Sequence, residues 1–299
     1  MALNLAQKGS VALQRQLSSI NGAPRTIDGG VLFGNTPRRL WSQWMQPDQD
    51  NLVKLASRVL LVQEQKRNIL VMAGSESLLA PLPRTCNCQP NAPSLLHNLA
   101  RLGLGENDID VVFFTHLHTW PSQDLLRVIE DGLVQRVLFP RAHYLTGKNH
   151  WRRAQHPHPH DRNLFVRWIV RQLEHSGRLK LLQAGSNAEL GAGWHLHESD
   201  GYTLGQLLPE ISMPGGPVLF AGDLIPAIRW LDLSLTGGYD RNPECLIGEK
   251  ERLLDHVIDR GGRLVLARDQ QAAAVRIFRD RQSRYSPYDQ QSALSREEV

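Results

Sequence analysis

Two histidines follow directly on an apolar stretch in the first half of the chain, and they are the residues with the clearest chemical potential. Residues 109–115 are mostly apolar and rich in β-branched and aromatic types, which predicts a short buried strand. His116 and His118 come next, separated by Leu117. Side chains two positions apart on an extended chain point the same way, so both imidazoles can reach one metal ion. Such a pair indicates a metal centre only when further ligands accompany it.

Six segments in a fixed order accompany this pair, and together they resemble the metallo-β-lactamase superfamily, specifically its lactonase-like metallo-hydrolases. The resemblance runs from about Ile27 to Phe278. The segments are IDGGVLFG at 27–34, the approach to the histidine pair at 98–115, FPRAHY at 139–144, FAGDLIP at 220–226, Tyr239-Asp240 and Arg268-Asp269. The resemblance implies an α+β fold of the αββα type, with two mixed β-sheets and helices on their outer faces. It also implies a two-metal hydrolytic centre, with Asp223 as the bridging carboxylate.

The ligand positions implied by the resemblance are only partly occupied by ligand residues. His116, His118 and Asp223 match the family pattern. Four other positions carry residues that the family does not use there: Trp120 for an aspartate, Pro121, Tyr202 and Arg268 for histidines. An indole and a proline ring do not ligate metal cations of this kind of site, and a guanidinium stays protonated in a protein, so it cannot be a ligand either. The sequence therefore predicts that the two-metal site is lost.

The remaining residues leave two interpretations of the first metal position open. Two histidines and a carboxylate form the ligand set of some zinc sites and of facial-triad iron sites, and Tyr202 can add a phenolate. Alternatively, Arg268 lies beside Asp223 and supplies the positive charge that the ions would have supplied, because a buried carboxylate without a partner is strongly destabilising. We favour the second interpretation, in which no metal cofactor is bound. The alternative is one zinc or iron ion held by His116, His118 and Asp223.

Two functional hypotheses follow from these interpretations. In the first, the chain is a pseudoenzyme that keeps the fold as a scaffold, or as a module that binds a protein partner or a small molecule. In the second, it is a mononuclear metal-dependent hydrolase of esters or lactones, by resemblance alone. We favour the first, with His116, His118 and Asp223 as the remnant of the site.

Other metal-binding residue types occur in the chain, and we interpret them as structural. His156, His158 and His160 alternate with prolines, which favours a solvated extended loop near the pocket mouth. His195 and His197 on a predicted strand can replace a lost ligand, but satisfaction by backbone hydrogen bonds is the expected state. Cys86 and Cys88 form a C-x-C pair, neither a redox motif nor a zinc knuckle, so we expect free thiols.

Composition and charge restrict the functional class further. Hydrophobic residues make up 41% of the 299 residues and charged residues 21%, as in ordinary globular proteins. The 34 basic residues exceed the 30 acidic residues only slightly and without a basic block, so no nucleic-acid partner is expected. No apolar window is long enough to cross a membrane, and the first twenty residues lack the apolar core of a signal peptide. We therefore predict a soluble cytoplasmic protein.

Hydrophobic periodicity predicts how the elements follow one another. Two apolar runs, 58–63 and 68–72, predict a β-hairpin. Helices are expected at 161–176 and 246–260, with a last helix ending near residue 279. Leu13, Leu17 and Ile20 at helical spacing suggest a short helix in an N-terminal extension, residues 1–25. A single domain then spans residues 26–280, followed by a polar, frayed tail at 281–299.

Overall fold

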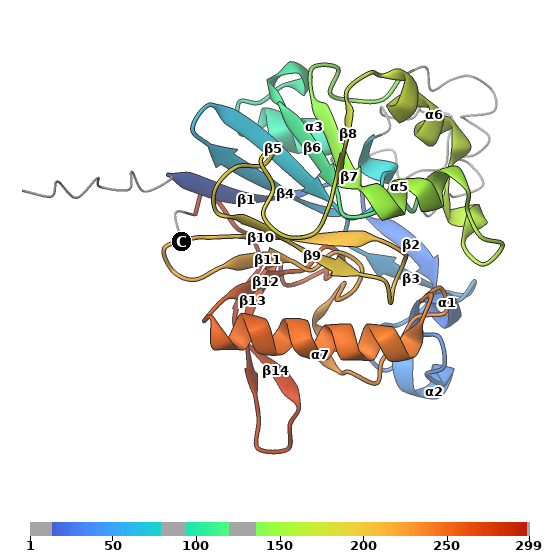
Figure 1. Cartoon of the computed structure of the whole chain (residues 1–299). Coiled ribbons are helices and arrows are strands. Elements are labelled where there is room, and N and C mark those ends of the chain that lie inside the picture. Colours follow the sequence, from blue (N-terminus) through green and yellow to red (C-terminus); the bar gives the residue numbers. More distant parts are fainter. Residues whose placement is uncertain (1–13, 79–93, 120–135, 298–299) are drawn as a thin grey trace, which may run out of the picture.

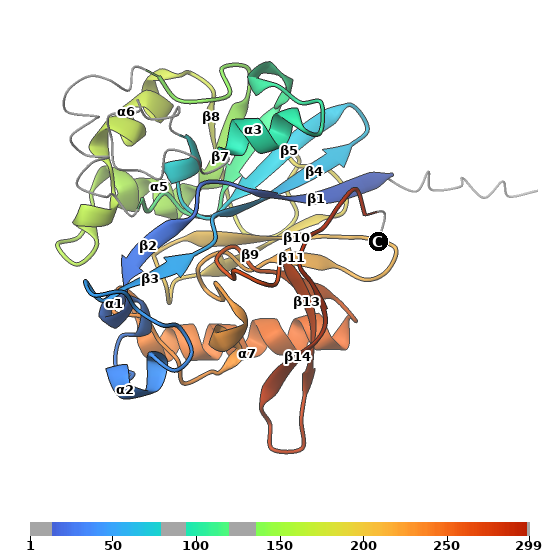
Figure 2. The same ribbon diagram turned by 180° about the vertical axis from the view of Figure 1, so that it is seen from behind.

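The computed structural model describes residues 14–78, 94–119 and 136–297, and it builds them into four layers (Figures 1 and 2). Two six-stranded sheets stack on each other. The outer face of the first sheet is covered by α3 (Leu95–Ala100), α5 (Lys148–Gln155) and α6 (Arg167–His175), and that of the second by α7 (Pro243–Asp259). This is the αββα arrangement of two mixed sheets that the sequence predicted.

The first sheet is built mostly from the N-terminal half of the chain. Its order is β1 (Arg15–Asn21), β4 (Arg58–Glu64), β5 (Arg67–Met72), β6 (Val111–Phe114), β7 (His143–Gly147) and β8 (Leu179–Leu182). The predicted hairpin is confirmed as β4 and β5, which pair in antiparallel register. Strands β5 to β8 run parallel. The predicted buried strand before the histidines is β6, whose four side chains are all buried.

The second sheet comes from the C-terminal half. Its order is β14 (Tyr285–Gln291), β13 (Ala274–Arg279), β12 (Arg263–Val265), β11 (Val218–Phe220), β10 (Gln206–Ile211) and β9 (Trp194–Ser199). Only β11 and β12 pair in parallel; the other neighbours are antiparallel. A separate two-stranded ribbon, β2 (Arg25–Asp28) with β3 (Leu52–Leu55), leads into the short helices α1 (Gly29–Phe33) and α2 (Arg38–Trp41).

Three apolar layers hold these elements together. The central layer lies between the sheets and includes Leu60, Phe113 and Phe220. The upper layer joins the first sheet to the helices α3 (Leu95–Ala100), α5 (Lys148–Gln155) and α6 (Arg167–His175). The lower layer joins the second sheet to α7 (Pro243–Asp259), α1 and α2. Burial on both faces explains why the central strands are continuously apolar.

The predictions for the two ends of the chain were wrong. Residues 15–21 form β1, not a helix, and Leu17 and Ile20 point into different apolar layers, as an odd spacing on a strand requires. The last predicted helix is β13, where Val275 and Ile277 alternate with Arg276. The supposed frayed tail contains β14, which pairs with β13. Polar side chains are tolerated there because β14 is an edge strand with much of its length exposed.

Helix boundaries also differ from the predictions for local reasons. Helix α7 begins at Pro243, because the Asn242 side chain caps it and proline suits the first helical turn. The predicted helix at 161–176 is a short 3-10 turn, Arg162–Leu164, followed by α6. The side chains of Phe165 and Val166 are buried between them in non-helical conformations. No helix in the described part of the chain is long and apolar enough to cross a membrane.

Candidate functional site

The site lies where the ends of strands from both sheets meet. His116 and His118 follow β6 at its C-terminal end, and Asp223 follows β11 in the second sheet. All three side chains are buried. The imidazole centroids are 5.4 Å apart, and His116 Nε2 lies 3.2 Å from Asp223 Oδ2. The structure thus brings together the three remnant ligands that the sequence singled out.

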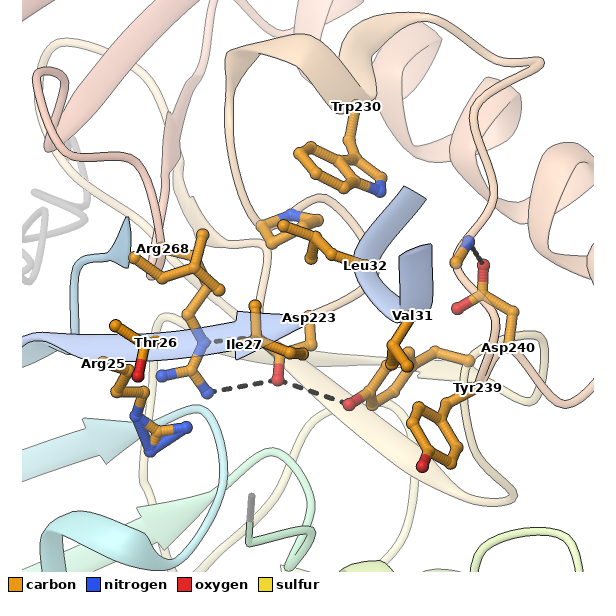
Figure 3. Close-up of a pocket in the computed structure, with 14 residues that line it drawn as sticks. Arg25, Thr26, Ile27, Val31, Leu32, Asp223, Trp230, Tyr239, Asp240 and Arg268 are labelled. Carbon is orange, nitrogen blue, oxygen red and sulfur yellow. Dashed lines mark hydrogen bonds and ion pairs between the residues drawn. The ribbon is translucent and has the colours of Figure 1, made fainter. Parts of the chain in front are cut away.

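Asp223 is held chiefly by Arg268, as shown in Figure 3. The guanidinium of Arg268 donates from Nε to Oδ1 at 2.8 Å and from Nη2 to Oδ2 at 3.1 Å. Nη2 also donates to the carbonyl oxygen of Ala73 at 2.5 Å. Arg268 and Asp223 are 4% and 9% exposed, so this is a buried two-point ion pair of the strong, charge-assisted kind. Asp269 does not share in it, because its carboxylate accepts backbone N–H groups of Ile228, Gln271 and Ala272.

Burial disfavours the ionised form of Asp223, but neighbouring side chains outweigh this effect on its pKa. Desolvation alone would raise the pKa of this carboxyl, but Arg268 and then His116 hold its pKa well below the usual value. Asp223 is therefore ionised at neutral pH. Burial lowers the pKa of His116 to about 4, despite the opposing influence of Asp223, and burial also lowers the pKa of His118. Both imidazoles are neutral at pH 7.

Tyr202 stands between the second histidine and the carboxylate. Its hydroxyl donates to Asp223 Oδ2 at 3.4 Å and lies 3.4 Å from His118 Nδ1. Burial and the charge of Asp223 raise the pKa of Tyr202 well above its ordinary value. The phenol therefore keeps its proton at neutral pH and serves as a hydrogen-bond donor to Asp223.

His118 is turned toward a residue that the sequence analysis missed. Its Nε2 lies 3.7 Å from Asp161 Oδ2 and 3.3 Å from the hydroxyl of Thr203. Arg153 donates to the same carboxylate oxygen at 3.0 Å. Asp161 begins the turn after the His-Pro segment, and no pattern in the sequence marked it as part of the site.

A third histidine, also missed, supports the loop that carries the pair. His150 on α5 is fully buried, accepts from the Leu117 N–H at 2.8 Å and contacts the Leu204 carbonyl oxygen at 3.0 Å. These partners require a neutral ring protonated on Nδ1. Burial, reinforced by His118 and His116, lowers the pKa of His150 well below its usual value. Its role is to fix the backbone between the two remnant ligands.

The remnant ligands do not converge as a metal site would require. Among the residues that the structure describes, the one group of three histidine, cysteine or carboxylate ligands with donor atoms within 4.8 Å of one another lies elsewhere, at His197, Glu210 and His256. Asp223 has both oxygens engaged by Arg268. The described residues therefore do not fit a two-metal centre. Trp120, Pro121, Cys86 and Cys88 lie outside the described residues.

A pocket opens beside the ion pair of Asp223 and Arg268 (Figure 3). One part of its wall is apolar and comes from β2, α1, β3 and the loop after β11. Its apolar side chains are Ile27, Val31, Leu32, Leu55, Pro226 and Trp230. Trp230 stacks on Phe33, and Phe33 stacks on Trp41, which makes this wall rigid. The polar part of the lining comprises Arg25, Thr26, Tyr202, Asp223, Tyr239, Asp240 and Arg268.

The remaining histidines named from the sequence have other partners. His156, His158 and His160 are exposed, and His160 Nε2 lies 3.3 Å from the carbonyl oxygen of Tyr239, at the pocket. His197 lies on β9, and the prediction that backbone groups satisfy its ring is wrong. Its Nε2 bonds instead to the side chain of Glu210.

Comparison with solved structures gives this architecture a context. A probable metal-dependent hydrolase from Staphylococcus aureus matches with a TM-score of 0.74 and 22% identity, over 93% of this chain and 98% of that one. AidC, a dizinc quorum-quenching lactonase in complex with the product N-hexanoyl-L-homoserine, matches with a TM-score of 0.70 and 15% identity, over 94% and 96%. The hydrolase AbOPH of the β-lactamase superfamily matches with a TM-score of 0.67 and 17% identity, over 94% and 95%.

The chain has the metallo-β-lactamase fold. The likeness covers nearly its whole length, so the fold inferred from the six sequence segments is confirmed. No protein-family model and no curated protein sequence matches the chain. At these identities the comparison establishes the fold, and the site must be interpreted from its own residues.

Proposed function

We propose that the metallo-β-lactamase fold of this chain serves to bind a small amphiphilic molecule with a carbonyl or carboxylate headgroup, such as an ester, a lactone or the corresponding hydroxy acid, without a two-metal centre. The observation that carries this proposal is the two-point contact between Arg268 and Asp223. This contact places a permanent positive charge on the carboxylate that would otherwise bridge two ions.

The lining of the pocket supports this ligand class. Its apolar wall suits an acyl chain, and burial of such a chain contributes about 0.8 kcal/mol per methylene group. At the polar end, the guanidinium of Arg268 supplies positive charge, and the phenol of Tyr202 can exchange its long contact with Asp223 for a hydrogen bond to a carbonyl or carboxylate oxygen. The AidC structure contains a product of this amphiphilic type, N-hexanoyl-L-homoserine.

Binding calorimetry on the full chain tests the proposal. N-acyl homoserines of increasing chain length and their lactones are titrated into the protein with and without EDTA. We expect saturable binding that tightens with chain length and is unchanged by EDTA. Leu32→Trp, which fills the pocket, should weaken binding at least tenfold, whereas Leu181→Trp on an exposed part of β8 should not. Binding that is equal in the two variants, or absent throughout, would overturn the proposal.

A second candidate is a single-metal hydrolase of esters or lactones. The 3.2 Å contact of His116 with Asp223 favours it, as does the presence of metal-dependent hydrolases and a dizinc lactonase among the similar structures. These comparisons favour a hydrolase over a scaffold without a ligand. Its test is turnover of the same lactones after addition of zinc or ferrous iron. Metal-stimulated hydrolysis that disappears in His116→Ala, with the fold intact by circular dichroism, would establish this candidate.

A further inference from the structure

Three side chains from three different elements meet on the face of the second sheet that α7 covers. His197 comes from β9, Glu210 from β10 and His256 from α7. The Nε2 atoms of His197 and His256 lie 2.8 Å and 2.6 Å from the same carboxylate oxygen, Oε2 of Glu210. The two imidazole centroids are 5.0 Å apart. We refer to these three residues as the His-Glu-His cluster.

The fold itself creates this cluster. Strands β9 and β10 are antiparallel neighbours, with His197 opposite Leu208, so Glu210 lies two residues further along the same face. Helix α7 runs across this face of the sheet (Figure 1) and brings His256 onto it from its last turns. His197 and Glu210, 13 positions apart, are brought together by strand pairing. His256 is 46 positions from Glu210 and joins them only through the packing of α7 on the sheet.

We propose that the His-Glu-His cluster is a binding site for one divalent transition-metal ion, of which zinc is the best match. Two imidazoles and one carboxylate are a ligand set of known zinc sites that keep a position open. In a tetrahedral site with bonds of roughly 2.0–2.2 Å, neighbouring ligand atoms stand about 3.3 Å apart. The donor atoms of the cluster need to separate by about half an ångström from their present contacts to admit the ion.

The surroundings of the cluster fit this role. Glu210 is 4% exposed in its side chain, and one oxygen of its carboxylate accepts from both histidines. His197 and His256 are 20% and 32% exposed, which leaves their rings free to make the small outward movement. A cavity between the sheet and α7 adjoins both rings, and it gives a fourth ligand such as water access to the ion.

Two neighbouring side chains, Arg260 and His195, lie close to the same site. Arg260 approaches the other carboxylate oxygen, Oε1, at 3.6 Å, and this contact turns Oε2 toward the imidazoles. Arg260 is 51% exposed, so solvent screens its repulsion of an ion. His195 lies beside His197, with ring centroids 4.7 Å apart, but it is exposed and outside the group whose donor atoms converge. His195 is therefore a matched control for the histidines of the cluster.

Metal titration of the chelator-stripped full chain tests the proposal, with Zn²⁺ followed by calorimetry and Co²⁺ by visible absorption. We compare the wild type, His197→Ala, His256→Ala and the control His195→Ala. We expect each cluster variant to lose one equivalent of bound metal relative to the wild type, or to bind that equivalent at least tenfold more weakly. His195→Ala should keep both its stoichiometry and its affinity. Co²⁺ should give the intense visible bands of a tetrahedral site in the wild type and in His195→Ala, but not in the two cluster variants.

The comparison between variants separates this proposal from any metal bound near Asp223. An ion bound at His116 and Asp223 would remain in both cluster variants, because neither variant touches that region. Equal affinity and stoichiometry in the wild type and both cluster variants would overturn the proposal. Both substituted side chains are partly exposed, and thermal unfolding of each variant checks that it folds. In addition, Zn²⁺ should raise the melting temperature of the wild type and of His195→Ala, but not of the cluster variants.

Discussion

Two buried carboxylates, Asp223 in the loop after β11 and Glu210 on β10, are neutralised in different ways. Arg268, itself buried, donates hydrogen bonds to both carboxylate oxygens of Asp223. Glu210 instead accepts from two partly exposed imidazoles that share one of its oxygens. A guanidinium cannot give up its proton to make room for a metal, whereas an imidazole can. This contrast underlies our two proposals, that Arg268 takes the place of a metal at Asp223 and that the His-Glu-His cluster binds a metal ion.

The largest effect should come from removing the arginine. Arg268→Ala leaves Asp223 buried without its main partner, and breaking a buried ion pair in this way costs about 3–5 kcal/mol. Urea unfolding followed by circular dichroism measures the loss. The matched control is Arg260→Ala at the other carboxylate, where the half-exposed arginine should contribute below about 1 kcal/mol. Equal losses of unfolding free energy in Arg268→Ala and Arg260→Ala would show that the two carboxylates do not differ in how strongly they depend on their arginines.

A third carboxylate sharpens the comparison. Asp240 lines the same pocket as Asp223, and its side chain accepts the Gly237 N–H. Burial raises its pKa to about 6. The native state therefore binds a proton more tightly than the unfolded state, so the unfolding free energy falls as the pH rises from about 4 to 6.

Asp240→Asn should abolish this decrease of the unfolding free energy with rising pH. At pH 8 the variant should be more stable than the wild type by about 1–2 kcal/mol, and the two should converge near pH 4. Denaturant unfolding across this pH range provides the measurement. A wild-type profile that Asp240→Asn leaves unchanged would show that the Asp240 carboxyl has an ordinary pKa and is well solvated.

The smallest effect should come from the phenol beside Asp223. Both hydrogen bonds of the Tyr202 hydroxyl are long, at 3.4 Å, so Tyr202→Phe should cost about 0.5–1 kcal/mol. This is well below the cost expected for Arg268→Ala. A loss for Tyr202→Phe as large as that of the arginine variant would mean that the phenol, and not the guanidinium, holds the carboxylate.

Most of the fold could be predicted from the sequence, and the failures have a common physical cause. The buried strand β6 and the hairpin of β4 and β5 have strong local patterns, and the six family-like segments fixed the topology. Edge strands β1 and β14 were missed because polar residues interrupt the apolar ones in each. In addition, β1 pairs with β4, which is far away in the sequence. The helical spacing of Leu17 and Ile20 was a coincidence of a strand that buries side chains on both faces, and Leu13 lies outside the described residues.

The residues of the site likewise fall into two groups, those that the sequence pattern marked and those that only tertiary packing brings in. The contact of Arg268 with Asp223 was predictable, because the replacement of a ligand by a permanent cation beside a buried carboxylate has a direct chemical meaning. Asp161 and His150 were not predictable, because they join the site only through the packing of α5 and the turn after it. The same holds for Glu210 and His256, which carry no motif. Glu210 meets His197 through the pairing of β9 with β10, and His256 joins them when α7 packs on the second sheet.

Metal analysis of the double variant His197→Ala/His256→Ala tests most directly whether Arg268 has replaced the metal at Asp223. This variant removes the His-Glu-His cluster and leaves His116, His118 and Asp223 as they are. Purified without chelator and analysed by inductively coupled plasma mass spectrometry, it should contain well under one equivalent of zinc, iron or manganese. One or two equivalents of tightly held metal in this variant would contradict the replacement of metal by Arg268.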